Sequence, residues 1–103
     1  MPHYHRADSW PRIVQETGQR RGVARYIHTL NPVEIQQIEE ECIRSGHEIA
    51  PDRMVFWREF DRVIGASSGE ETEFVRVEIT SNIYHGRPVT QAEIRREIRA
   101  NET

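Results

Sequence analysis

Apolar residues recur along the chain at helical spacing in some segments and alternate in others, and these patterns predict the order of the elements. The clearest helix follows Asn31, a good N-cap, with Pro32 at the first helical position and Glu34 three residues after the cap. Residues 39–41 are acidic and are expected to face solvent, and Gly46 supplies the terminating residue. The opposite side carries an apolar stripe formed by Val33, Ile35, Ile38, Cys42 and Ile43.

Two segments before this helix also show apolar residues three and four positions apart. Residues 10–15 predict a short helix with Pro11 in its first turn, ended by Gly18. Residues 23–30 have the same spacing, so we predict a helix there, although so short a run also fits a strand.

A second capping box opens a terminal helix. Thr90 is followed three residues later by Glu93, which is the spacing in which each side chain bonds the other residue's backbone N–H. Ile94 and Ile98 are one helical turn apart and are expected to lie on the buried side.

The segments between the helices have the patterns of strands. Residues 54–60 are rich in apolar and aromatic side chains at both odd and even positions, which predicts a strand covered on both faces. Residues 61–64 are expected to extend this strand past a bulge. Residues 65–69 are expected to form a small polar loop. Residues 74–80 alternate strictly and predict a half-buried antiparallel strand. One of its faces carries Val75, Val77 and Ile79, and the other carries Arg76, Glu78 and Thr80.

The strand at residues 74–80 is followed by a turn at Ser81 and Asn82, a short strand at residues 83–85 and a break at Gly86. The resulting order predicts an α+β fold with N-terminal helices packed on a small antiparallel β-sheet and a C-terminal helix. Residues 1–9 lack an apolar period and are expected to be a flexible arm or the end of a linker. We expect residues 10–103 to form a single domain, because 103 residues cannot build two stable cores.

Composition excludes several classes of protein. No apolar stretch approaches the roughly 20 residues that cross a bilayer, and we expect no cleaved signal. Cys42 is the only cysteine, so an internal disulfide and a paired-cysteine zinc site are both excluded. The net charge of −3 argues against nonspecific coating of nucleic acid, but it allows a local basic site. All 14 basic side chains are arginine, which fits the codon bias of a GC-rich genome first, and second a selection for bidentate phosphate contacts, which suit arginine better than lysine.

Reactive side chains concentrate between residues 76 and 90. Cleavage of RNA requires a base for the 2′-hydroxyl proton, an acid for the leaving oxygen, and cations near the developing phosphorane charge. Histidine as a residue type has an ordinary pKa near neutrality, so His85 fits the base or the acid, and Arg87 and Arg76 fit phosphate binding. Supporting roles fit Glu78, Thr80 and Tyr84. In the alternative interpretation, Arg76 and Glu78 form a solvated cross-strand pair and residues 85–86 form only a turn.

Three short motifs resemble the C-terminal toxin domains of bacterial polymorphic toxins. They are residues 60–65 (FDRVIG), residues 75–80 (VRVEIT) and residues 84–88 (YHGRP), and residues 2–6 are similar to the junction that precedes such domains. The resemblance implies a small α+β ribonuclease that acts on tRNA or other RNA and is neutralised by a cognate immunity protein. It also implies a bacterial protein in the cytoplasm of the producer or target cell, delivered as part of a larger secreted protein. Many of the resembled domains have histidine where this chain has Arg87, so Glu78, Tyr84 or another histidine such as His28 must complete the acid–base pair.

The sequence therefore predicts a metal-independent ribonuclease with catalytic residues His85, Glu78, Tyr84 and Thr80 and with Arg87 and Arg76 as substrate-binding residues. We expect RNA and an immunity protein as partners, and no cofactor, DNA or membrane. His3 and His5 have the spacing of metal ligands, although terminal histidines of this kind are usually free. The main alternative is a noncatalytic binding module, such as an immunity protein or a phage-type inhibitor, that docks through the acidic residues 39–41. Transfer of ADP-ribose from NAD is a third hypothesis.

Overall fold

The computed structural model describes residues 9–50 and 52–102 and has an α+β fold, as predicted. Residues 1–8 lie outside the described part of the chain, so the predicted arm, except for Ser9, and both His3 and His5 are outside it too. The helices are α1 (Trp10–Thr17), α2 (Pro32–Ser45) and α3 (Gln91–Glu102). The strands are β1 (Arg25–Tyr26), β2 (His47–Glu48), β3 (Val55–Glu59), β4 (Gly65–Ser67), β5 (Glu70–Thr72), β6 (Phe74–Thr80) and β7 (Ile83–Val89).

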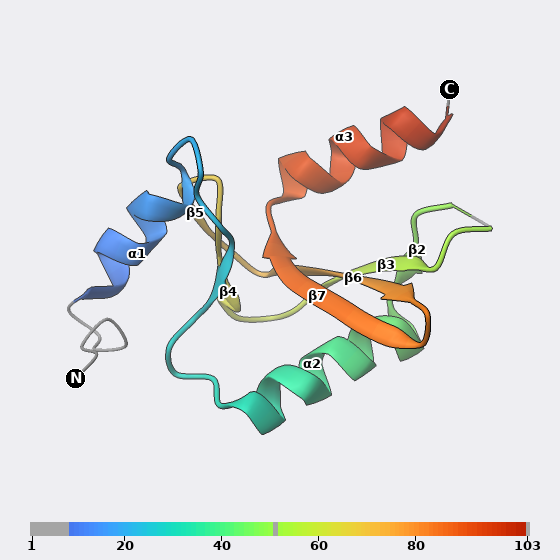
Figure 1. Ribbon diagram of the computed structural model, residues 1–103, viewed down its shortest axis with the longest axis horizontal. Coiled ribbons are helices and arrows are strands. Elements are labelled where there is room, and N and C mark those ends of the chain that lie inside the picture. The colour runs from blue at the N-terminus through green and yellow to red at the C-terminus, as the bar shows by residue number, and fades with distance from the viewer. Residues whose placement is uncertain (1–8, 51, 103) are drawn as a thin grey trace.

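A four-stranded antiparallel sheet with the order β2-β3-β6-β7 forms the larger part of the fold. Helix α2 lies along one face of this sheet, and α3 lies over the other (Figure 1). Strand β6 has the predicted bounds and alternation, because Val75 and Val77 are fully buried whereas Arg76 and Glu78 on the opposite face keep some exposure to solvent. The inward side chains meet α2 in a core that contains Leu30, Ile38, Cys42, Ile64, Val75 and Val77.

Helix α2 begins at the predicted capping box. The side chain of Asn31 accepts a hydrogen bond from the Glu34 backbone N–H at 2.8 Å, and the Glu34 carboxylate accepts one from the Asn31 N–H at 3.0 Å. Gly46 follows the last turn, as predicted. The stripe is narrower than predicted, since Val33 is 63% exposed.

Strand β7 is longer than predicted. A two-residue turn joins it to β6, and both turn residues, Ser81 (φ 52°) and Asn82 (φ 65°), have the positive φ of a type I′ turn. Gly86 does not break the strand, because β6 supplies a continuous ladder of partners from residue 83 to residue 89. The backbone of β7 passes so close to α2 at Gly86 that an added Cβ would overlap the carboxylate of Glu39.

A second, three-stranded antiparallel sheet with the order β1-β4-β5 lies beside the first, and α1 packs on it (Figure 1). The predicted helix at residues 23–30 is wrong, because Arg25 and Tyr26 pair with Ala66 and Gly65 as a strand. The predicted polar loop at residues 65–69 is also wrong. Residues 65–67 form the central strand of this sheet and are buried, and only Ser68 and Gly69 form the turn.

The positions of α1 and β3 agree with the sequence patterns in most respects. Helix α1 carries its proline in the first turn, is followed by Gly18, and buries Trp10 and Ile13 against Ala66. Strand β3 is covered on both faces, with Val55 only 1% exposed, but it ends at Glu59. Residues 61–64 do not extend it, because they carry the chain across to the second sheet.

Candidate functional site

The hairpin of β6 and β7 brings four of the six predicted site residues together. Its register pairs Arg76 with Arg87 and Glu78 with His85. Directly paired residues of an antiparallel ladder project to the same face, with Cβ atoms about 4.5–5.5 Å apart. The four side chains therefore form two adjacent cross-strand pairs on the face that α3 partly covers. Of these, His85 and Arg87 are exposed and Arg76 and Glu78 are partly buried.

Arg76 is held by α3. Its Nε and Nη2 atoms donate to the two carboxylate oxygens of Glu97, each at 2.8 Å, and its Nη1 lies 3.3 Å from Glu78 Oε1. The Arg76 side chain is 12% exposed. This bidentate pair occupies the planar edge of the guanidinium that a phosphate would need, so Arg76 fixes α3 to the sheet and positions Glu78.

Glu97 lies among several positive charges. Hydrogen bonds from Arg76 lower the pKa of the Glu97 carboxylate against the opposing effect of burial, and the charges of Arg53 and Arg87 lower it further. The same hydrogen bonds raise the pKa of Arg76. Arg87 is the cross-strand neighbour of Arg76, and within the described residues no hydrogen bond or ion pair occupies its guanidinium.

The remaining predicted site residues lie elsewhere. Tyr84 pairs with Ile79, so it projects to the α2 face, on the opposite side of the sheet from His85. Thr80 is on the same face as Glu78 but at the exposed end of β6, next to the turn. His28 lies beside Trp10 of α1, with ring centroids 6.0 Å apart, so it belongs to the neighbouring cluster. Neither Tyr84 nor His28 is placed to complete an acid–base pair with His85.

The predicted site lies on the face of the larger sheet that α3 partly covers. Depressions on the described part of the chain occur between α1 and the loop that follows it, between β5 and the start of α3, beside residues 58–61, and along α3. None of these four is lined by His85 or Glu78. A substrate at this hairpin would therefore be bound from one side, with Arg87 as the available cation, because Glu97 occupies Arg76.

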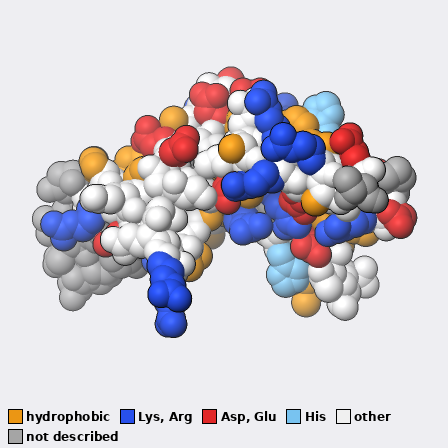
Figure 2. Space-filling view, turned by 90° about the horizontal axis from the view of Figure 1, so that it is seen from above, with side chains coloured by type: hydrophobic (Ala, Val, Ile, Leu, Met, Phe, Trp, Pro, Cys, Tyr) orange, Lys and Arg blue, Asp and Glu red, His pale blue; other side chains and the backbone are white. Residues whose placement is uncertain are grey.

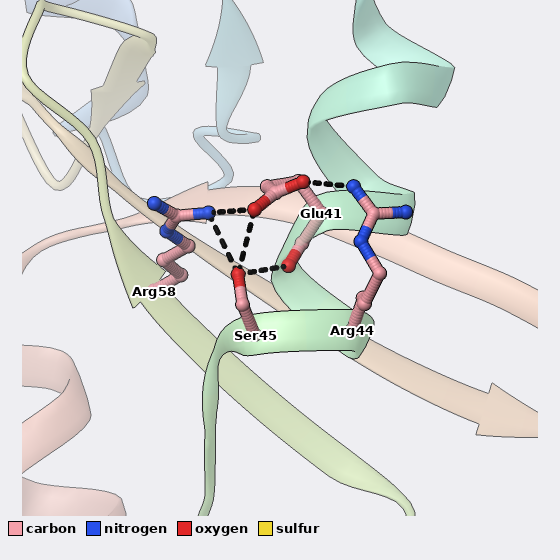
Figure 3. A network of polar contacts seen from close by, with 4 residues as sticks. All are labelled: Glu41, Arg44, Ser45 and Arg58. Carbon is pink, nitrogen blue, oxygen red and sulfur yellow. Dashed lines mark hydrogen bonds and ion pairs between the residues drawn. The ribbon is translucent and has the colours of Figure 1, made fainter.

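The acidic residues of α2 do not form a solvent-facing patch, which corrects the prediction for residues 39–41. Glu39 turns inward and accepts a hydrogen bond from the Tyr26 hydroxyl at 2.7 Å. Glu41 is bound by Arg58, by Ser45 and by Arg44 (Figure 3). Hydrogen bonds from Ser45 and Arg58 lower its pKa. Only Glu40 remains exposed, where it accepts a hydrogen bond from Gln36 at 3.3 Å.

Sequence reasoning missed the role of Glu97. A signal was present, because Glu93 and Glu97 are spaced four residues apart and border Ile94 and Ile98, which places both carboxylates beside the buried side of α3. The partner of Glu97 was not predictable, since Arg76 is 21 residues away in the sequence.

Within residues 9–50 and 52–102, no group of three or more histidine, cysteine, aspartate or glutamate residues is arranged to hold a metal ion. The same residues contain no helix long and apolar enough to cross a membrane. Comparison of the chain with models of protein families, with curated proteins and with solved structures gave no match.

Proposed function

We propose that this chain is a metal-independent ribonuclease, and that it serves as the effector domain of a bacterial polymorphic toxin. The observation that supports the proposal is the cross-strand pairing of His85 with Glu78, beside the exposed Arg87. These side chains combine an imidazole, a carboxylate and a free guanidinium on one face.

The proposed reaction uses the 2′-hydroxyl of RNA as its nucleophile. The Glu78 carboxylate accepts the 2′-hydroxyl proton while the 2′-oxygen bonds to phosphorus, and Arg87 stabilises the charge of the phosphorane. The bond from phosphorus to the 5′-oxygen breaks, and the imidazolium of His85 gives its proton to that oxygen. The products are a 2′,3′-cyclic phosphate and a 5′-hydroxyl, and a proton exchange with water restores Glu78 and His85.

Two of the predicted residues have other roles in this proposal. Arg76 is a positioning residue, because Glu97 occupies its donors while its third nitrogen lies against Glu78. Tyr84 projects from the opposite face and takes no part in the chemistry. RNA is the proposed substrate, and a dedicated immunity protein is the proposed partner in the producing cell.

The contacts of α2 give little support to the alternative, a noncatalytic module that docks through an acidic helix face. The carboxylates of Glu39 and Glu41 already bind Tyr26 and Arg58. Docking through them would require these internal contacts to break. Only Glu40 is left to attract a basic partner from this part of the helix.

Incubation of the purified chain with total RNA and with tRNA in EDTA tests the proposal. We expect discrete fragments that end in a 2′,3′-cyclic phosphate. We also expect His85→Ala and Glu78→Gln each to lower the cleavage rate by about 100-fold or more, because each removes one proton-transfer step. Arg87→Ala should lower it as well. His47→Ala is the matched control, since His47 is exposed on β2 of the same sheet but is not part of the hairpin. Intact RNA at high protein concentration, or equal loss in the control, contradicts the proposal.

A further inference from the structure

The outer face of α3 carries a row of arginines that the proposed catalytic site does not use. Arg95, Arg96 and Arg99 lie on the side of the helix turned away from the sheet, and all three are exposed. No ion pair joins any of them to another residue of the described part of the chain. In Figure 2, which views the molecule from the α3 side, basic side chains gather over the middle of this face. This local concentration stands out on a chain with a net charge of −3.

These arginines line an open groove of about 510 Å³. Its other polar lining includes Thr90 and Gln91 at the start of α3 and Glu70 of β5. No aromatic or large aliphatic side chain lines the groove. Protein partners usually bury such side chains at the centre of an interface, whereas a nucleic-acid strand is bound mainly through its phosphates by arginine. The lining therefore favours a polyanionic strand over a protein.

The helix that carries the groove is fixed in place. Its inner side buries Ile94, which is 3% exposed, and holds Arg76 through Glu97. Near its ends, Ser68 donates to Glu93 at 3.2 Å and Arg53 donates to Asn101 at 2.9 Å. A binding face on such a helix needs little ordering when a ligand arrives, which lowers the cost of binding.

We propose that the outer face of α3 binds the phosphate backbone of a single RNA strand, on nucleotides outside the cleaved step. This inference rests on the proposed function for the identity of the ligand. Arg87 lies on β7 between His85 and the start of α3, so one strand has cationic side chains available from the helix to the hairpin. The outer face then sets affinity for long RNA, and the hairpin carries out the chemistry.

The test compares the triple variant Arg95→Gln/Arg96→Gln/Arg99→Gln with a control of equal charge change, Arg12→Gln/Arg20→Gln/Arg62→Gln, whose arginines are exposed outside α3. Glutamine keeps the helix propensity of arginine, and circular dichroism checks that both variants fold. The probe is a fluorescein-labelled 2′-O-methyl RNA of about 12 nucleotides, a length within the usual range of single-strand sites. It lacks a free 2′-hydroxyl and is not cleaved.

For binding between about 50 and 200 mM salt, we expect the triple variant to lose affinity about tenfold at the lowest salt. The slope of log affinity against log salt should become shallower by about 2, because each lost single-strand phosphate contact contributes about 0.7. The control should change affinity less than twofold. For cleavage, KM for long RNA should rise in the triple variant, while the rate on a dinucleoside monophosphate, which has only the scissile phosphate, should stay the same.

The outcomes separate this inference from the proposed function. Equal affinity and equal salt slope in the triple variant and the wild type overturn the inference, even if RNA is cleaved. Failure of the wild type to bind the RNA probe overturns it too. Binding of an acidic protein instead of the probe would show that the face is a protein-binding surface. Binding with the expected loss in the triple variant, but without cleavage of RNA by the wild type, supports the RNA-binding face and removes the catalytic proposal.

Discussion

At the scale of single residues, Gly86 of β7 lies against the side chain of Glu39 of α2. Glu39 in turn accepts the hydrogen bond of Tyr26. Burial, together with the Glu39 carboxylate, raises the pKa of the Tyr26 hydroxyl, which therefore remains a donor at any physiological pH. These three residues connect β1, α2 and β7, and they fix the back of the hairpin that carries His85.

Gly86→Ala tests this arrangement. The added methyl group displaces the Glu39 carboxylate from Tyr26, so we expect a loss of about 1–3 kcal/mol in the free energy of unfolding, measured by urea denaturation. In a Glu39→Ala background the methyl group meets no carboxylate, and its cost should be at least about 1 kcal/mol smaller. Equal costs in the two backgrounds would show that Gly86 and Glu39 are independent.

At the scale of elements, the attachment of α3 to the sheet combines apolar burial and one ion pair. Ile94 enters the interface, and the capping box of Thr90 and Glu93 fixes the start of the helix. Burial would raise the pKa of Glu93, but the hydrogen bonds from Thr90 and the β4–β5 turn outweigh it and lower the pKa. Glu97 has a lowered pKa as well, through Arg76. Both carboxylates therefore contribute stability in their ionised forms.

This attachment predicts acid-sensitive stability. The folded-state pKa of Glu97 is below its unfolded value of about 4.5, so its contribution is complete above pH 4.5 and is lost as the pH falls through the folded pKa. We expect Glu97→Gln to cost about 1–3 kcal/mol at pH 7, because it removes the bidentate charge partner of the largely buried Arg76 and leaves only the longer contact with Glu78. The difference from the wild type should shrink below pH 4.5. Thermal unfolding from pH 3 to pH 7 measures it, with the exposed Glu102→Gln as the control. A difference that is constant over this range would contradict the assignment.

At the scale of the whole molecule, the two sheets share contacts along β7. The hydroxyl of Thr72 at the end of β5 donates to the carbonyl oxygen of Val89, the last residue of β7, at 2.7 Å. Away from β7, the Ile27 N–H donates to the Ile64 carbonyl oxygen at 2.8 Å. Ile64 is fully buried with Cys42 and Val77 in the larger core, although it directly precedes β4 of the smaller sheet. The core under α2 therefore includes residues that lead into both sheets.

Cys42 reports on the opening of this core. Its side chain is 0% exposed, and burial raises its pKa to about 12, so little reactive thiolate exists near neutrality. At pH 8 without denaturant, we expect a thiol reagent such as DTNB to label Cys42 at least about 1,000-fold more slowly than in the unfolded chain. The labelling rate should rise with urea along the global unfolding transition. Labelling within seconds under native conditions would show that the core around Cys42 opens locally.

Part of the candidate site was predictable because strand periodicity is a local property. The alternation from residue 74 to residue 80 placed Arg76 and Glu78 on one face, and the turn at Ser81 and Asn82 indicated a return strand. The sequence did not determine which side chains of the return strand share the face of Arg76 and Glu78. In the observed register, with two residues in the turn, His85 and Arg87 share the face of Glu78, and Tyr84 faces the other side.

The errors in the fold have a common physical cause, which is that residues 23–30 and residues 65–69 carry weak local signals. Residues 23–30 are too few to distinguish helical from extended spacing, and the small polar side chains of residues 65–69 are typical of a loop. Pairing with each other makes both segments strands, as Arg25 and Tyr26 take their partners from residues 65 and 66. Ala66 is small because α1 packs directly on it.

The sequence by itself determined the features set by neighbouring residues: the capping boxes at Asn31 and Thr90, the alternation of β6, the ends of α1 and α2, and the α+β class. Each depends on interactions that span only a few residues, so composition and spacing are sufficient. Only the tertiary structure decided that Glu97 binds the guanidinium of Arg76, that Glu39 and Glu41 are bound internally, and that three arginines of α3 face outward. These outcomes depend on contacts between distant segments, which form only when burial of the apolar faces brings the helices and the sheets together.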